Sequence, residues 1–139
     1  MMTLTTDDLE SLAGSYMGQG RWRDDAGGEG AYHVTHNVEV TEKGPRVSFH
    51  HIFDNGDPDV EAAFNLEWSV SPLLAVKAGD AVIGSGYVAG ALCHYTLQLG
   101  DKIVESTFQP HNGGLRVYGS SSKNADGNFI AWSEVLERR

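Results

Sequence analysis

Two histidines, His36 and His51, fall on the apolar faces of neighbouring segments that alternate with period two. The first segment, residues 31–41, places on one face Tyr32, Val34, His36, Val38 and Val40. The second, residues 45–53, places on one face Val47, Phe49, His51 and Phe53. Alternate side chains of a strand point to the same side, so both apolar faces are predicted to point inward. If residues 42–45 form a four-residue turn, His36 lies directly opposite His51, with Cβ atoms about 5 Å apart.

A pair of imidazoles on an apolar wall suits several kinds of chemistry. His36 and His51 can bind a transition metal, hydrogen-bond a polar group of a ligand, or act as acid and base. A metal ion normally needs a third ligand, which the sequence does not identify. The structural alternative is a pair of buried histidines that share a water molecule or a backbone carbonyl. A register shift of one residue would remove the pair altogether.

A second candidate site lies in the hairpin predicted over residues 91–109. The face that carries Cys93 and Tyr95 is the more apolar and is predicted to point inward, which leaves His94 and Glu105 exposed. If the hairpin is inverted, His94 and Glu105 become a candidate catalytic acid and base pair.

The other inward-facing side chains are mostly aliphatic or aromatic, as expected for a pocket that accepts a small apolar molecule. In residues 60–70 the alternation points Trp68 inward, and in the last segment Trp132 shares a face with Glu134. The candidate ligand-binding residues are His36, His51, Phe49, Trp68, Tyr95 and Trp132.

The elements that position these residues are predicted to be strands. Period-two segments follow one another after Gly14, separated by turn residues about every ten positions. They cover residues 15–23, 31–41, 45–53, 60–70, 73–78, 80–88, 91–99, 102–109, 114–121 and 128–137. No helical stretch separates them, which favours antiparallel neighbours. A closed barrel leaves no strand edge unpaired, so we predict an all-β fold: one domain over residues 1–139, an antiparallel up-and-down barrel of about ten strands.

A short helix is predicted before the first strand. Thr5 or Thr6 can cap it, Asp7 and Asp8 suit the positive end of its dipole, and Gly14 ends it. Such a helix is long enough to act as a lid on the barrel, but too short to form part of its core.

The stretch from Leu12 to Gly30 holds six of the seventeen glycines. Glycines inside a strand mark bends, bulges or a close approach of another group, which predicts a strongly bent first strand. Gly14-x-Tyr16-x-Gly18-x-Gly20 resembles the Gly-x-Trp-x-Gly-x-Gly opening of nitrobindin-like proteins, in the calycin group of lipocalins and fatty-acid-binding proteins. The resemblance implies a calycin-like barrel with a short N-terminal helix, whose lumen holds a small apolar ligand or haem.

The resemblance also implies a haem-ligating histidine near the C-terminal strand. Residues 128–139 contain no histidine, and the nearest upstream one is His111. This departure disfavours haem as the cofactor, although haem or metal binding through His36 or His51 stays an alternative.

The composition limits the partners. Ten basic and nineteen acidic side chains give a formal charge of −9, which argues against nucleic acid because phosphate backbones attract clusters of Lys and Arg. The single cysteine, Cys93, excludes an intramolecular disulfide. The sequence shows no signal peptide and no apolar run approaching the roughly 20 residues that cross a bilayer, so we expect a cytoplasmic protein with no membrane contact.

The function favoured by the sequence is binding of a small apolar molecule inside the barrel. The alternatives are an enzyme of isomerase, cyclase or hydrolase type that uses the lumen histidines, and a haem-binding or metal-binding protein. A further alternative is an interaction protein that forms a homodimer through an exposed strand.

Overall fold

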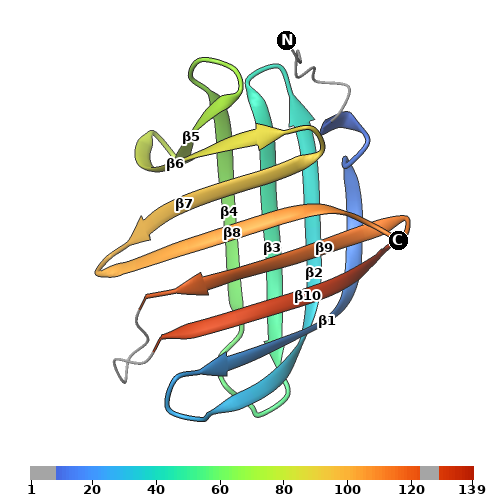
Figure 1. Cartoon of the computed structure of the whole chain (residues 1–139), viewed down its shortest axis with the longest axis vertical. Helices are drawn as coiled ribbons and strands as arrows, with labels where there is room; N and C mark the ends of the chain where they lie inside the picture. Colours follow the sequence, from blue (N-terminus) through green and yellow to red (C-terminus); the bar gives the residue numbers. More distant parts are fainter. Residues whose placement is uncertain (1–8, 123–128) are drawn as a thin grey trace.

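The computed structural model describes residues 9–122 and 129–139, which form ten strands. In chain order they are β1 (Gly14–Asp24), β2 (Glu29–Thr41), β3 (Gly44–Phe53), β4 (Val60–Trp68), β5 (Leu73–Ala78), β6 (Ala81–Ala89), β7 (Leu92–Leu99), β8 (Lys102–His111), β9 (Gly114–Ser121) and β10 (Ile130–Arg138). Each strand pairs antiparallel with its neighbours in sequence, and β1 also pairs with β10, which closes the barrel (Figure 1). The predicted antiparallel barrel of about ten strands is confirmed.

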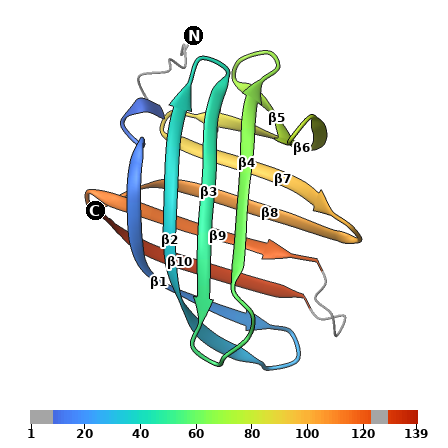
Figure 2. The same cartoon turned by 180° about the vertical axis from the view of Figure 1, so that it is seen from behind.

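The strands of the barrel run in two main directions. β2, β3 and β4 follow the long axis of the molecule, whereas β7 to β10 cross it (Figure 1). Figure 2 shows the same crossing from behind. β1 pairs with β2 over residues 14–23 and with β10 over residues 16–24, and it bends from the first direction into the second. The glycine-rich start of the sequence therefore forms the bent strand that was predicted.

Burial alternates along the strands as the sequence predicts. In β2 the side chains of Tyr32, Val34 and His36 are buried, whereas His33 and Glu39 are exposed. The inward-facing apolar side chains of all ten strands form one hydrophobic core. The lumen is therefore the core of the protein, and a polar group on its wall is enclosed by apolar neighbours.

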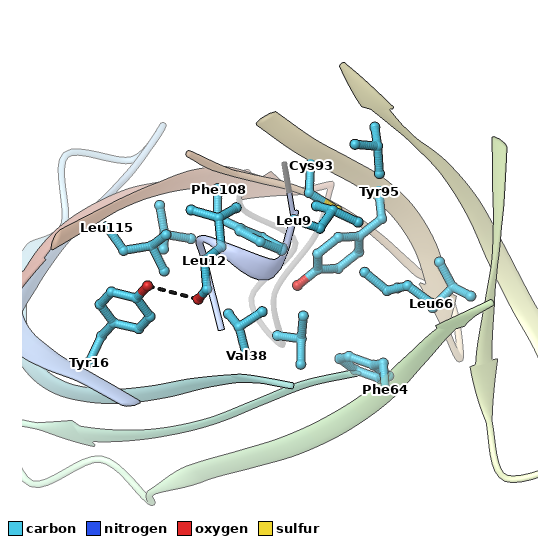
Figure 3. Close-up of a cluster of buried hydrophobic side chains, with 14 of the residues drawn as sticks. Leu9, Leu12, Tyr16, Val38, Phe64, Leu66, Cys93, Tyr95, Phe108 and Leu115 are labelled. Carbon is cyan, nitrogen blue, oxygen red and sulfur yellow. Dashed lines mark hydrogen bonds between the residues drawn. The ribbon is translucent and has the colours of Figure 1, made fainter. Parts of the chain in front are cut away.

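One end of the barrel is closed by the segment before β1. Leu9 and Leu12 are each 1 % exposed and pack beside Phe108 and Leu115 (Figure 3). The hydroxyl of Tyr16 donates a hydrogen bond to the carbonyl oxygen of Leu12, at 2.7 Å.

Most of the predicted N-terminal helix lies outside the described residues. Leu9 and Glu10 are helical and residues 11–12 form a turn, in which the amide of Leu12 donates to the carbonyl of Leu9 and that of Ala13 to the carbonyl of Glu10. The described residues contain no helix with the length and apolar character that spanning a bilayer requires. The described part of this segment thus contributes two buried leucines, Leu9 and Leu12, to the closed end of the barrel.

Candidate ligand-binding site

The register between β2 and β3 differs by two residues from the predicted one. His36 lies opposite Phe49, and His51 lies opposite Val34. The predicted direct pair of His36 and His51 is therefore wrong. Because the difference is two residues and not one, both histidines keep the inward-facing side of their strands.

The cause of the difference lies in the turn. Thr41 pairs with Gly44, so residues 42 and 43 form a two-residue turn in place of the predicted four-residue turn over 42–45. The hydroxyl of Thr41 donates to the carbonyl oxygen of Gly44 (2.8 Å) and accepts the amide of Lys43 (3.2 Å). Side-chain hydrogen bonds of this kind stabilise a local turn that residue periodicity alone does not predict.

Phe49 separates the two imidazoles. Its ring centroid lies 6.1 Å from that of His36 and 4.7 Å from that of His51, with interplanar angles of 9° and 22°. Metal ions bind imidazole nitrogens at about 2 Å, so a shared ion needs the two rings to converge on one point. Within residues 9–122 and 129–139, no group of three or more His, Cys, Asp or Glu side chains is placed to hold a metal ion. The geometry does not favour the metal alternative for this pair.

A carboxylate that the sequence did not single out lies in the same part of the lumen. Glu134 of β10 is 2 % exposed. The hydroxyl of Tyr32 donates to Glu134 Oε2 at 2.7 Å, and Nε2 of His51 lies 3.4 Å from the same oxygen. The other oxygen, Oε1, is buried and has no hydrogen-bond partner among the described residues. The available signal was a glutamate between Trp132 and Leu136 on one face of the last strand.

Tyr32 reaches Glu134 because Gly20 lies between them. Gly20 pairs with Tyr32 on one side and with Glu134 on the other. A Cβ atom at Gly20 would overlap the ring of Tyr32 and lie 2.6 Å from its hydroxyl oxygen. The missing side chain lets the phenol lie across β1, which explains why a strand keeps a glycine at this position.

Replacing Gly20 with alanine is expected to destabilise the protein by about 1–3 kcal/mol, because the new methyl group displaces the Tyr32 ring. Denaturant unfolding of Gly20→Ala in the wild-type and Tyr32→Ala backgrounds forms a double-mutant cycle that isolates this contact. In the Tyr32→Ala background the same change should cost nothing or stabilise slightly, since alanine suits a strand better than glycine. An equal loss in both backgrounds would show that the Tyr32 ring is not the cause.

Burial dominates the electrostatics of this cluster. It raises the pKa of Glu134 from 4.5 to about 7, against the opposing effect of the Tyr32 hydrogen bond. It lowers the pKa of His51 to about 4, with a smaller contribution from the nearby His50. The contact with Glu134 would favour a protonated His51, but the desolvation of both groups outweighs it. Near neutral pH the imidazole is therefore uncharged, and the carboxyl group is close to its titration midpoint.

His36 is the second unsatisfied polar group in the lumen. It is 2 % exposed, and neither Nδ1 nor Nε2 has a hydrogen-bond partner among the described residues. Burial, followed by the proximity of His51, lowers the pKa of His36 from 6.5 to about 4. Its ring lies 5.9 Å from that of Phe108 and 6.1 Å from that of Phe49.

The lumen residues do not fit the haem that the sequence resemblance implies. His36 is enclosed by aromatic neighbours, and the inward face of β10 carries Glu134 where a histidine would be needed. Among the described residues, the inward face of the last strand therefore supplies no histidine of the kind that the resemblance implies for haem.

The remaining candidate residues are distributed along the barrel. Tyr95 is buried opposite Ser106, and its hydroxyl points into the interior (Figure 3). Trp132 is half-buried and covers Gly119 on β9. Trp68 is also half-buried, but its amide donates to the carbonyl of Lys43, which places it by the β2–β3 turn. The structure thus brings His51 to Glu134 and leaves Trp68 near the turn.

The second predicted site points away from the lumen. The 91–109 hairpin has the predicted register, with the Cys93 face buried. His94 is half-buried on the outer side, with Nδ1 2.8 Å from the hydroxyl oxygen of Thr107. Glu105 is exposed and lies opposite Thr96. The inverted hairpin, which would turn His94 and Glu105 inward as an acid and base pair, is not the arrangement observed.

Two clefts are open on the surface. One, of about 520 Å³, lies along β1, β2 and β10 and is lined in part by Arg21, Arg23 and Trp132. The other, of about 650 Å³, lies beside the β2–β3 turn and is lined largely by charged and turn residues. Neither cleft is lined by His36 or Glu134, which are each 2 % exposed.

Comparison with known proteins supports the fold. The sequence matches no protein-family model, and no curated protein is significantly similar to it. The solved S-type phycobiliprotein lyase CPES from Guillardia theta superposes with a TM-score of 0.76 at 10 % identity, over 99 % of this chain and 93 % of that one. A protein of unknown function from the DUF3598 family of Nostoc punctiforme gives a TM-score of 0.60 at 14 % identity over 94 % of this chain, which spans 48 % of that protein. The chain therefore shares its antiparallel barrel fold with these solved structures.

Proposed function

We propose that the barrel binds a small, largely apolar molecule in its lumen, next to His36, His51 and Glu134. The observation that carries this proposal is the unsatisfied polar groups inside an apolar core: both ring nitrogens of His36 and Oε1 of Glu134. Buried polar atoms in folded proteins nearly always have a hydrogen-bond partner, and each exception calls for an explanation, such as a bound water, ion or ligand. A ligand with one polar end would supply that partner.

The walls around these atoms suit the apolar part of such a ligand. Phe49 and Tyr95 line the lumen, and Phe53 and Trp132 are half-buried. Burial of apolar surface against such residues provides about 25 cal/mol per Å², while a few polar groups orient the ligand. The neutral dye Nile red, which is small and largely apolar, is the probe that we would use.

Two adjacent alanines on β4 provide a matched test. Ala62 faces inward opposite Phe49, whereas Ala63 is exposed opposite Ser48. We expect Ala62→Trp to weaken Nile red binding at least about tenfold, since an indole would occupy the lumen, which corresponds to about 1.4 kcal/mol. Ala63→Trp should bind the dye as the wild type does.

The measurement is a fluorescence titration of each variant, after circular dichroism and cooperative thermal unfolding have shown that it is folded. If Ala62→Trp does not fold, Ala62→Leu takes its place with a smaller expected loss. Equal dye affinities of the two tryptophan variants would mean that the dye binds outside the lumen, which would contradict the proposal.

A further inference from the structure

We propose that the polar group of the ligand is a positively charged nitrogen, which pairs with Glu134 beside the rings of Tyr32, His51 and Phe53. This inference rests on the proposed function and adds the chemical class of the ligand.

The first support is the lack of a buried positive charge near Glu134. Among the described residues that are buried, Glu134 is the only acidic side chain, and no lysine or arginine is buried. Arg138 follows Glu134 on the same side of β10, but it is exposed and donates to the carbonyl oxygens of Ser11 and Ala13. The carboxylate is therefore available to a charged group that a ligand brings.

The second support is the way in which the carboxylate is held. Tyr32 donates to Oε2 and leaves Oε1 without a partner. Glu134 is already desolvated in the unliganded protein, so binding of an ammonium group adds only the desolvation of that group. A charge-assisted hydrogen bond to Oε1 is about twice as strong as a neutral one, which offsets this cost.

The third support is the two rings that contact the carboxylate, Tyr32 and His51, together with the Phe53 ring that packs against both of them. The ring centroid of Tyr32 lies 4.8 Å from that of His51 and 5.4 Å from that of Phe53. Aromatic faces attract cations through their quadrupole, most strongly where water is excluded. A carboxylate next to several aromatic rings is an arrangement that suits an alkylammonium group.

The same arrangement disfavours an anionic ligand. A carboxylate in this part of the lumen would meet Glu134 with no buried cation to compensate, and like charges repel strongly at low dielectric. The formal charge of −9 acts in the same direction at long range, because it attracts cations and repels anions. The site is thus built for an apolar amine in preference to a fatty acid.

The experiment compares three probes of equal chain length, n-decylamine, n-decanol and sodium decanoate, as competitors of Nile red at pH 8.5. We expect decylamine to bind the wild type at least tenfold more tightly than decanol, and decanoate to bind more weakly than either. In Glu134→Gln, which keeps the shape and removes the charge, the ratio of decylamine to decanol affinity should fall to about one. Glu137→Gln, which removes an exposed carboxylate of the same strand, should keep the wild-type ratio.

The outcomes separate the two proposals. If neither decanol nor decylamine displaces the dye from the wild type, binding in the lumen is refuted and this inference falls with it. If decanol displaces the dye but decylamine binds no better, or if Glu134→Gln keeps the preference for the amine, only the inference about the charged nitrogen is overturned.

Discussion

Between pH 7.5 and pH 4.5 the wild type should lose about 2–3 kcal/mol of unfolding free energy that a His36→Leu variant keeps. Burial lowers the pKa of His36 from 6.5 to about 4 in the folded protein. Between these two values the unfolded chain binds a proton at this imidazole and the folded protein does not. Protonation of His36 in the unfolded chain therefore does not lower the free energy of unfolding above pH 6.5. As the pH falls from 6.5 towards 4, that free energy decreases.

At pH 7.5 the same variant should be as stable as the wild type or more stable. Leucine has a volume close to that of histidine and removes two buried nitrogens that have no partner among the described residues. An unsatisfied buried polar group costs about 1–3 kcal/mol, which offsets an imperfect fit of the leucine.

The measurement is denaturant unfolding of both proteins at pH 7.5 and pH 4.5. His33→Leu is the matched control, because it removes an exposed histidine from the outer face of the same strand. If the wild type and His36→Leu lose the same free energy between the two pH values, His36 does not resist protonation in the folded state. That result would point to a bound partner for its ring.

Glu134→Gln should have the opposite pH dependence. Burial raises the pKa of Glu134 from 4.5 to about 7, so the folded protein disfavours the charged form that the unfolded chain adopts above pH 4.5. Below pH 4.5 Glu134 does not change the free energy of unfolding of the wild type. As the pH rises from 4.5 to 7, ionisation of Glu134 in the unfolded chain lowers that free energy progressively. At pH 8.5 the loss amounts to about 3 kcal/mol.

Glutamine removes this loss and can still accept the hydrogen bond from Tyr32. We therefore expect Glu134→Gln to be more stable than the wild type at pH 8.5 by up to that amount, and similar to it at pH 4.5. Glu137→Gln reports the general effect of removing one negative charge from β10. Identical pH profiles for Glu134→Gln and the wild type would mean that Glu134 is well solvated or has a positively charged partner in the folded state.

The barrel and the direction of most of its side chains were predictable, because the relevant information is local. Alternation with period two identifies a strand and its inner face, and residue pairs such as Gly100–Asp101 set the register of a hairpin by themselves. Apolar alternation thus placed His36 and His51 inside, and Cys93 and Tyr95 on the buried side of β7.

The registers and contacts that depend on distant residues were not predictable in this way. The turn between β2 and β3 was predicted two residues too long, because the hydrogen bonds of Thr41 favour the shorter one. A register shift of two residues leaves every side chain on the same face of its strand, so the alternation of apolar and polar residues does not reveal it.

Glu134 shows the same limit most clearly. Its strand has two similarly apolar faces, and only its pairing with β1 turns Glu134 inward, next to Gly20 and within reach of Tyr32. That contact joins residues 102 positions apart in the chain. The sequence alone determined a barrel with histidines inside it, since neighbouring residues encode strands and faces. Closure of the barrel decided which carboxylate His51 meets, because only the tertiary structure brings the first and last strands together.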